Sequence, residues 1–231
     1  MDNFVVENMS FQKEKYKAIL AELGTTRLVA VSKTKLAYDI QALYDLGQRD
    51  FGENYVQELV DKYEILPKEI HWHFIGHLQT NKVKYIAPFV SLIHGVDSFK
   101  LLKEINKQGE KNNRVIDCLL QVYIAQEETK FGLDEDELDA IFGSAELKEL
   151  KNINIIGMMG MASFTENQDD IRNEFRYLKT LFHSYSHLKI ENGRLTILSM
   201  GMSADYKIAV EEGSNMVRIG SLIFGERNYD Q

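Results

Sequence analysis

Two lysines close a short apolar run near the start of the chain. The run RLVAVS is typical of a buried β-strand, and Lys33 follows it directly, with Lys35 two residues further on. A lysine held at the end of a buried strand loses solvation, which lowers the pKa of its amine and lets the neutral amine attack an aldehyde. Lys33 is thus a candidate for covalent attachment of a carbonyl compound. The alternative is a solvated lysine at the start of a loop, which also explains Lys35.

Two glycine-containing turns near the other end of the sequence have the composition of a phosphate site. They are SMGMSADY and RIGS, each directly after an apolar run. Gly201 and Gly220 let backbone N–H groups approach an anion. The hydroxyls of Ser203 and Ser221 can donate to phosphate oxygens, and Ser203 can cap a helix that begins at Ala204. Two ordinary strand-to-helix turns are the alternative.

A lysine facing such turns is a more specific signal than either feature alone. The combination is expected for a phosphorylated aldehyde cofactor, of which pyridoxal phosphate is the obvious candidate. Arg218 then has a definite role, because an arginine at the pyridine nitrogen keeps its own proton and leaves that nitrogen unprotonated. The ring becomes a poorer electron sink, which favours tight holding of the cofactor or modest chemistry at Cα. Alternatively, Arg218 pairs with a carboxylate such as Glu53.

The elements that must position these residues alternate between strand and helix. Short runs rich in β-branched residues are each followed by a stretch with helical period, and no linker composition separates them. Gly47, Pro67 and Pro88 predict the ends of three helices. An additional helix around Phe11 to Leu23 precedes the first strand. The predicted strands are Arg27 to Ser32, Asp50 to Gly52, His71 to Ile75, Leu92 to Val96, Asp117 to Tyr123, Ile153 to Met159, Leu195 to Ser199 and Met216 to Ile219.

Eight strand-helix units in 231 residues indicate a closed barrel rather than an open sheet. The glycine-rich dinucleotide and P-loop signatures of open sheets are absent. In a (β/α)8 barrel the chemistry lies at the C-terminal ends of the strands, which is where Lys33 and both glycine-containing turns fall. We therefore expect one (β/α)8 TIM-barrel domain over residues 1–231, with an additional N-terminal helix.

The composition favours a small-molecule partner. The chain has 27 basic and 35 acidic residues, a formal net charge of -8 and no basic block, so nucleic acid and anionic membranes are poor partners. No secretory signal or membrane-spanning segment is recognisable, and the single cysteine, Cys118, lies in an apolar run where a buried, inert thiol is expected. We expect a cytoplasmic monomer.

Several long motifs then identify a family. In order along the chain they are VSKTK, QRDFGENYVQE, WHFIGHLQTNK, SLIHGVDS, KFGL, LSMGMSADY and MVRIGSLIFGER. Together they closely resemble the pyridoxal phosphate homeostasis proteins, which are related to the N-terminal barrel of alanine racemase. The resemblance covers nearly the whole chain. It implies a single barrel that carries pyridoxal 5′-phosphate as an internal aldimine on Lys33 and acts in cofactor balance, with PLP-dependent apoenzymes as possible recipients.

The resemblance also assigns the remaining ligands of the cofactor. It places Asn54 near the ring and Arg218 at the pyridine nitrogen. It assigns the phosphate to the two glycine-containing turns, through Met200, Gly201, Ser203, Gly220 and Ser221. Two departures from the family pattern are visible, since proline is often found where Leu36 and Ser163 stand here.

Two other functions are compatible with the sequence. A racemase-like or other weak PLP enzyme would need a second acid or base opposite Lys33, which the related racemases take from a C-terminal domain, whereas only LIFGERNYDQ follows the last predicted strand here. A metal site is the other alternative, because His71, His73 and His77 form an H-x-H-x3-H pattern. No nearby carboxylate is expected to complete that set. Lys35 and Lys82 are further candidates for the covalent attachment.

Overall fold

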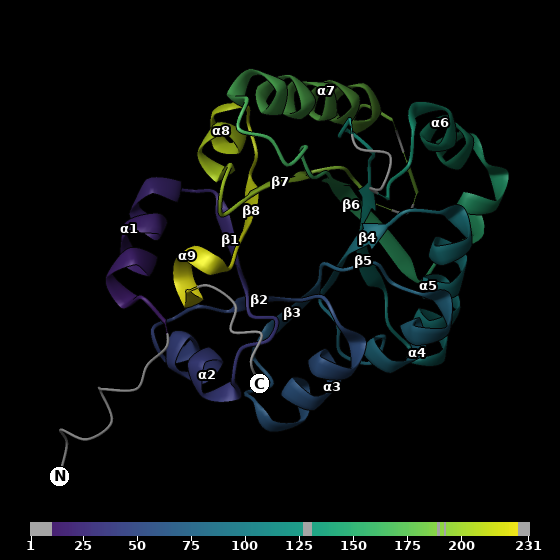
Figure 1. Ribbon diagram of the computed structural model, residues 1–231. Coiled ribbons are helices and arrows are strands. Elements are labelled where there is room, and N and C mark those ends of the chain that lie inside the picture. The colour runs from purple at the N-terminus through teal and green to yellow at the C-terminus, as the bar shows by residue number, and fades with distance from the viewer. Residues whose placement is uncertain (1–10, 127–130, 189, 192, 226–231) are drawn as a thin grey trace, which may run out of the picture.

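The computed structural model describes residues 11–126, 131–188, 190–191 and 193–225, and within them eight parallel strands close into a barrel (Figure 1). The strands follow one another around the barrel in chain order, and β8 pairs with β1 to close it. This confirms the predicted (β/α)8 fold. The strands are β1 (Arg27–Val31), β2 (Asp50–Glu53), β3 (His71–Phe74), β4 (Leu92–Val96), β5 (Ile116–Gln121), β6 (Ile153–Met159), β7 (Ile197–Met202) and β8 (Met216–Ile219).

Helices surround the barrel on the outside, as Figure 1 shows in a view along its axis. Helix α1 (Lys13–Leu23) is the additional N-terminal helix that the sequence predicts. Gly47 follows α2 in the left-handed region at φ 103°, as its C′ position requires. The other helices are α2 (Ala37–Asp45), α3 (Val56–Ile65), α4 (Val83–Ile86), α5 (Phe99–Lys111), α6 (Glu135–Gly143), α7 (Gln168–Ser186), α8 (Tyr206–Glu211) and α9 (Ser221–Phe224), with 3₁₀ turns η2 (Thr80–Lys82) and η3 (Ala145–Glu149).

Most predicted strand limits agree with the structure to within two residues, but β7 does not. The strand starts two residues later than predicted, at Ile197, and ends three residues later, at Met202. It therefore includes Gly201, which was predicted to lie in a turn, and Met202 pairs with Arg218 after a register shift. The helix after it begins at Tyr206 with Asp205 as its N-cap. The expectation that Ser203 caps a helix starting at Ala204 is therefore wrong, because pairing with β8 extends the strand to Met202 and Ser203 and Ala204 form the turn before the helix.

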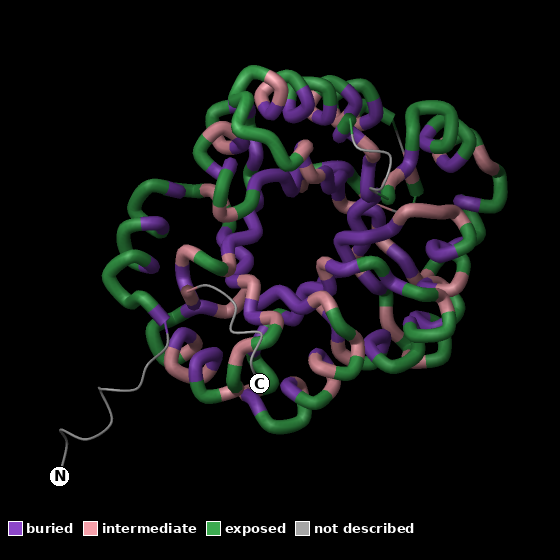
Figure 2. Tube along the Cα trace, in the orientation of Figure 1, coloured by how far each residue is buried: buried purple, intermediate pink, exposed green. Residues whose placement is uncertain are grey.

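Two apolar clusters form the core. A large cluster joins the outward side chains of the strands to the inward faces of the helices, where Figure 2 shows buried residues on the tube. A small cluster fills part of the barrel itself and contains Val29, Leu92, Leu119, Met159 and Met216. The remainder of the interior holds buried polar side chains. The barrel is therefore only partly apolar inside.

Two expectations about the chain as a whole can be compared with the described residues. Cys118 is fully buried and unpaired, and burial raises the pKa of its thiol, which agrees with an inert side chain. None of the helices in the described segments combines the length and apolarity that crossing a membrane requires.

Gly157 in β6 provides a test of the strand packing. An added Cβ would collide with the carbonyl oxygen of Ile197, so alanine must push β6 away from β7. We predict that Gly157→Ala lowers the free energy of unfolding by about 2 kcal/mol. Gly143→Ala is the matched control, because space around the end of α6 is open, and it should change stability by less than about 0.5 kcal/mol. Urea unfolding measures both, and equal losses would contradict the packing.

Candidate functional site

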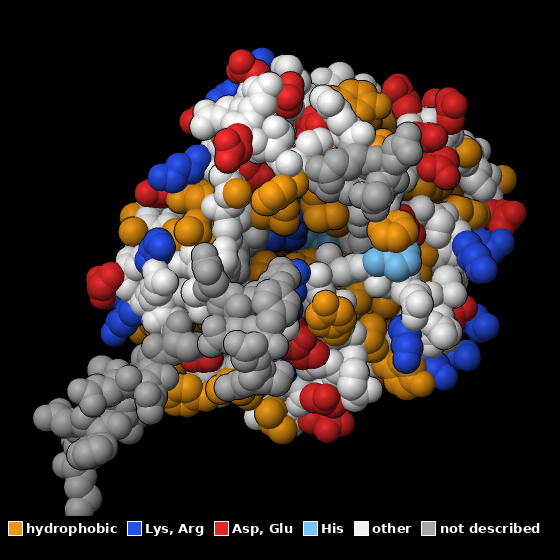
Figure 3. All heavy atoms as spheres, viewed as in Figure 1, with side chains coloured by type: hydrophobic (Ala, Val, Ile, Leu, Met, Phe, Trp, Pro, Cys, Tyr) orange, Lys and Arg blue, Asp and Glu red, His pale blue; other side chains and the backbone are white. Residues whose placement is uncertain are grey.

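A cavity of about 750 Å³ opens at the C-terminal end of the strands. The space-filling view shows a hollow at the middle of this face, with basic and histidine side chains in its depth and hydrophobic side chains around its rim (Figure 3). Residues from β1, β2, β3, β6, β7 and β8 or the segments after them contribute to its wall. Six of the eight predicted cofactor ligands line it: Lys33, Asn54, Ser203, Arg218, Gly220 and Ser221.

The other two predicted ligands lie outside the lining. Met200 is fully buried in the core between barrel and helices. Gly201 has φ 94°, and a Cβ there would lie 2.5 Å from the Cβ of Ala209 in α8. Backbone conformation and helix packing therefore explain this glycine without a ligand. The phosphate-binding roles of both residues remain predictions from the family resemblance.

Arg218 lies on β8 at the base of the cavity and is almost completely buried. Its guanidinium donates to the backbone oxygen of Ser199 at 2.9 Å, to Ser199 Oγ at 2.7 Å and to the Gly160 oxygen at 3.1 Å. Burial lowers the pKa of Arg218 to about 10, against the opposing charge of Asp205, so the side chain stays cationic at neutral pH. Pairing with Glu53, the alternative from sequence, is wrong, because these backbone and hydroxyl oxygens accept its bonds.

The two glycine-containing turns meet on one side of the cavity. The N–H of Gly220 donates to Ser203 Oγ at 3.3 Å, which connects the segment after β7 to the segment after β8. Ser221 is exposed at the start of α9. Asp205 is buried behind them and accepts from the N–H of Met202. Two serine hydroxyls thus lie at the cavity wall, where they can donate to a phosphate group, while the Gly220 N–H bonds to one of them.

The turn that carries Lys33 has a strained backbone, which a hydrogen bond to a carboxylate supports. Lys33 is half-buried directly after β1, and the next residue, Thr34, adopts a left-handed φ of 63°. This conformation is unfavourable for a β-branched residue and needs support from its surroundings. The N–H of Thr34 donates to Glu58 Oε1 of α3 at 2.6 Å, which supplies that support.

A buried ionic network continues this support inward. Lys62 of α3 donates to the backbone oxygen of Ser32 at 2.8 Å and forms ion pairs of 2.7 Å with Glu53 and Glu58. Ser32 Oγ also donates to Glu53 at 2.6 Å. Burial raises the pKa of Glu53 to about 7 although Lys62 opposes that shift, so desolvation outweighs the ion pair. Nothing in the sequence analysis singled out this network, because it joins residues of three separate elements.

The other lysine candidates differ in position. Lys35 is half-buried, contributes to the cavity wall and donates to the backbone oxygen of Phe224 at 3.1 Å, so solvent alone does not explain it. Lys82 is exposed and belongs to a separate cavity of about 590 Å³ beside α3, together with His77 and Tyr85. Of these two lysines, only Lys35 reaches the cavity with Lys33.

The histidine pattern does not form a metal site within the described residues. His71 and His73 both contact Asp50, at 3.2 and 3.0 Å, which corrects the expectation that no carboxylate lies near them. His77 instead pairs with Asp97 at 2.9 Å. No group of three or more suitable side chains in the described part of the chain is arranged to hold a metal ion.

The two departures from the family pattern have different structural consequences. Leu36 is exposed, and its φ of −69° and ψ of 149° already suit a proline. Ser163 lies on the cavity wall, and its N–H and hydroxyl both donate to the buried Glu174 of α7 at 2.7 Å. A proline there would lack the N–H, so this chain anchors the segment after β6 in its own way.

Asn54 provides a test of whether the cavity suits a polar ligand. Its side-chain oxygen is buried, lies on a residue of the cavity wall and has no hydrogen-bond partner among the described residues. An unpaired buried oxygen costs about 1–3 kcal/mol, which a bound polar group can recover. Together with the Arg218 cation, the two serines and the Lys33 amine, it fits an anionic heteroaromatic aldehyde.

Comparison with known proteins identifies the class of protein to which this chain belongs. The family model for the alanine racemase N-terminal domain matches residues 10–228. The alanine racemase from Bartonella henselae superposes with a TM-score of 0.70 at 16% identity over 90% of this chain and 59% of its own, which shows the shared fold. The chain is thus a member of the alanine racemase N-terminal domain family.

More similar relatives identify a more specific family. The pyridoxal phosphate homeostasis protein of Aquifex aeolicus (strain VF5) is 44% identical over 205 residues, 88% of each chain. The protein of that name from Escherichia coli (strain K12) is 34% identical over 99% of each chain. PipY of Synechococcus elongatus PCC7942, solved with PLP bound, is 32% identical, with a TM-score of 0.83 over 92% of this chain and 99% of its own. The chain belongs to the pyridoxal phosphate homeostasis protein family.

Removal of Lys62 tests the ionic network. Lys62→Met leaves Glu53 buried without its cation, so we predict a loss of about 3 kcal/mol in the free energy of unfolding at pH 8. The pKa of Glu53 is raised from 4.5 to about 7, so its protonated form contributes stability below pH 4.5 that is lost as the pH rises through 7. The loss should therefore be smaller at pH 5.

Urea unfolding of wild type and variant at the two pH values measures this difference. Lys17→Met is the control, because Lys17 forms an exposed pair with Glu14 and its removal should change stability by less than about 0.5 kcal/mol at either pH. An equal loss for Lys62→Met at pH 5 and pH 8 would show that Glu53 does not titrate as described.

Proposed function

We propose that this protein binds pyridoxal 5′-phosphate in the cavity at the barrel mouth and serves in the homeostasis of that cofactor. The observation that carries the proposal is the convergence of Lys33, Arg218 and the two glycine-containing turns on one cavity. The presence of PLP in PipY, at 32% identity over 92% of this chain, supports it. The family of pyridoxal phosphate homeostasis proteins supports the cellular role.

Each part of the cofactor has a matching group in the cavity. Lys33 supplies the amine for covalent attachment of the aldehyde carbon. Ser203 and Ser221 donate their hydroxyls to the phosphate, and the Gly220 N–H donates to Ser203 Oγ and so fixes that hydroxyl. Arg218 presents its cation to the ring nitrogen, and Asn54 lies beside the ring. The cofactor, when bound, supplies a conjugated aldehyde that is reactive toward amines.

The proposed role is to carry or buffer the cofactor rather than to turn over a substrate. Arg218 stays cationic and cannot receive a proton from the ring, so it does not strengthen the ring as an electron sink. We propose further that the protein acts as a monomer in the cytoplasm and that PLP-dependent apoenzymes receive the cofactor. Met200 and Gly201 lie within β7, and their contribution to the phosphate site rests on the family resemblance alone.

Replacement of Lys33 tests the attachment site. Incubation of wild type with pyridoxal 5′-phosphate followed by borohydride should leave one reduced adduct, which peptide mass spectrometry places on Lys33. We predict that Lys33→Ala loses at least about 90% of this adduct, because no other amine holds the same position at the end of β1. Lys35→Ala is the matched control from the same cavity wall and should keep most of it.

Two results would contradict this assignment. An undiminished adduct in Lys33→Ala, located on Lys35 or Lys82, would move the attachment site. Absence of any adduct in a folded wild-type protein, together with no visible absorption band on addition of the cofactor, would contradict cofactor binding itself.

A racemase-like activity is the alternative for the same site. We predict that the loaded protein racemises or deaminates alanine and other common amino acids no faster than an equal concentration of free pyridoxal 5′-phosphate. Chiral chromatography of the amino acid over several hours measures this rate. A rate at least tenfold above that of free cofactor, lost in Lys33→Ala, would make the protein an enzyme.

A further inference from the structure

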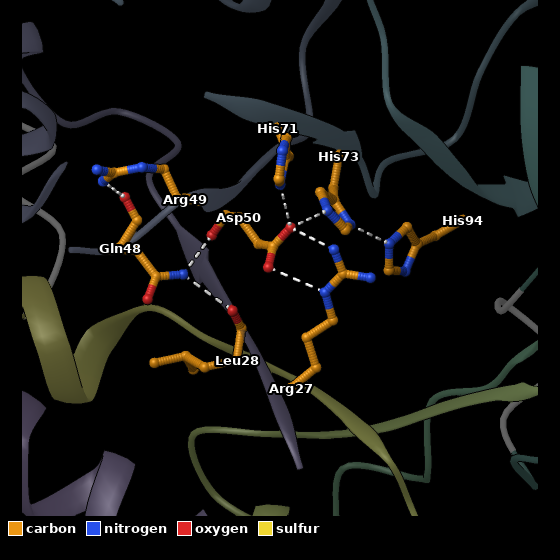
Figure 4. A network of polar contacts seen from close by, with 8 residues as sticks. All are labelled: Arg27, Leu28, Gln48, Arg49, Asp50, His71, His73 and His94. Carbon is orange, nitrogen blue, oxygen red and sulfur yellow. Dashed lines mark hydrogen bonds and ion pairs between the residues drawn. The ribbon is translucent and has the colours of Figure 1, made fainter. Parts of the chain in front are cut away.

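A line of buried polar side chains crosses the interior of the barrel from its N-terminal end toward the cavity. Figure 4 shows the first half, in which Arg27 and His73 converge on Asp50 and His73 contacts His94. Ser199 of β7 continues the line from His94. Ser199 also accepts from Arg218, the cation at the base of the cavity. Six strands, β1, β2, β3, β4, β7 and β8, thus contribute to one connected line of polar side chains.

The distances support hydrogen bonding at every step. Arg27 donates two bonds of 2.9 Å to the Asp50 carboxylate, and Asp50 lies 3.0 Å from His73 Nε2. His73 Nδ1 is 2.9 Å from His94 Nε2, and His94 Nδ1 is 3.3 Å from Ser199 Oγ. Ser199 Oγ is 2.7 Å from the Arg218 guanidinium.

The groups at the two ends of this line of hydrogen bonds determine which atom donates at every step. The Asp50 carboxylate only accepts, because hydrogen bonds from His73 and Arg27 hold its pKa far below the usual range against the effect of burial. His73 must therefore donate through Nε2–H and accept at Nδ1, which requires His94 to donate through its own Nε2–H. His94 Nδ1 then accepts from the Ser199 hydroxyl, whose oxygen accepts from Arg218. Every proton in the chain points toward Asp50.

This arrangement is costly, because it buries polar side chains away from water. His73, His94, Ser199 and Arg218 are all at least 97% buried, and apolar residues already fill the neighbouring interior positions. Burial lowers the pKa of both histidines, so they remain neutral near pH 7. A buried polar chain of this length is tolerated only when all its members are satisfied, and it then specifies one orientation for each side chain.

We propose that Asp50, His73, His94 and Ser199 form a one-way hydrogen-bond relay that positions Arg218 for the cofactor ring and transmits the negative charge of Asp50 to it. This inference rests on the proposed function. Ser199 Oγ presents a polarised oxygen to the guanidinium and holds it against β7. The charge that the ring nitrogen meets at Arg218 therefore depends on a carboxylate at the opposite end of the barrel.

Several other charged or titratable groups lie near the relay, and a pH experiment must distinguish their effects on Arg218 from the effect of Asp50. Arg27 and His71 face Asp50 and His73, while Arg218 faces His94. Asp205 is the acidic group that acts on Arg218 from the side of α8. Of these, Asp50 is joined to Arg218 only through the two histidines and Ser199.

The direction of the relay can be tested on the protein without cofactor. Nitrogen-15 NMR of labelled histidines distinguishes the two neutral tautomers. We expect the Nε2–H tautomer for both His73 and His94, unchanged between pH 6 and pH 8. A Nδ1–H tautomer at His94, or protonation of either histidine in this range, would overturn the one-way relay whether or not the protein binds the cofactor.

The effect on the cofactor is tested with two matched pairs of variants. Ser199→Ala breaks the relay next to Arg218, and Ser214→Ala removes another buried serine that bonds only to backbone atoms of β7 and β8. Asp50→Asn removes the distant charge, and Asp117→Asn removes a carboxylate from the same end of the barrel that lies outside the relay. Urea unfolding verifies that each variant is folded.

The readout is the pH midpoint of the visible absorption change of the bound cofactor. Loss of the polarised acceptor leaves more positive charge at Arg218 and disfavours the protonated cofactor. We therefore expect Ser199→Ala and Asp50→Asn to lower the midpoint by roughly 0.5 to 1 pH unit, with their controls within about 0.2 of wild type.

Equal midpoints in all four variants, or equal shifts in each pair, would contradict the relay while leaving cofactor binding intact. If wild type binds no cofactor, the proposed function fails and this role of the relay with it.

Discussion

The pairing of β1 with β8 is the interaction on which the site depends. Four register pairs, from Arg27 opposite Met216 to Ala30 opposite Ile219, close the barrel between the first and last strands. Closure brings Lys33, at the end of β1, to the same cavity as Arg218 and Gly220, which lie about 185 residues later in the chain. Without this pairing the Lys33 amine and the two glycine-containing turns would belong to opposite edges of a sheet. The covalent and ionic parts of the proposed site are therefore made adjacent by backbone hydrogen bonds.

Two polar networks support this arrangement from different sides. The Glu53–Lys62–Glu58 network holds the strained turn that presents Lys33, and the relay from Asp50 to Ser199 holds Arg218. Both cost desolvation that an apolar core would avoid. Their common property is that each fixes the position of one basic residue of the cavity, Lys33 through its backbone and Arg218 through its guanidinium. A cofactor carrier benefits from such order, because less entropy is lost when the cofactor binds.

The fold and most of the candidate site could be predicted from the sequence for a physical reason. Strand-helix alternation is local, and the rule that chemistry lies at the strand C-termini predicts that the ends of separate strands share one site. Lys33, Ser203, Arg218, Gly220 and Ser221 line one cavity as this rule predicts, and Asn54, which the family resemblance assigned, lines it too. The predicted end of β7 was wrong, because the segment around Gly201 was interpreted as a turn, whereas its pairing with β8 extends the strand to Met202. Gly201 shows the same limit, since its glycine requirement comes from contact with α8.

The networks were missed because they join residues from separate elements whose relative depth the sequence does not reveal. His73, His94 and Ser199 are each the third residue of their own strand, although in the register of β3 and β4 His73 lies opposite Leu92. Alternation along each predicted strand would have placed all three inside the barrel. Asp50, at the first position of its strand, was the carboxylate that the histidine pattern needed. A comparison of interior positions across strands, instead of motifs along the chain, would have found the relay.

The measurement that tests the central claim most directly is a crystal structure of the protein grown with pyridoxal 5′-phosphate. The account predicts continuous density from Lys33 Nζ into the cofactor, with the phosphate at Ser203 and Ser221 and the ring nitrogen within hydrogen-bond distance of Arg218. Cofactor bound elsewhere, for instance beside Lys82, or an empty barrel mouth at saturating cofactor, would contradict it.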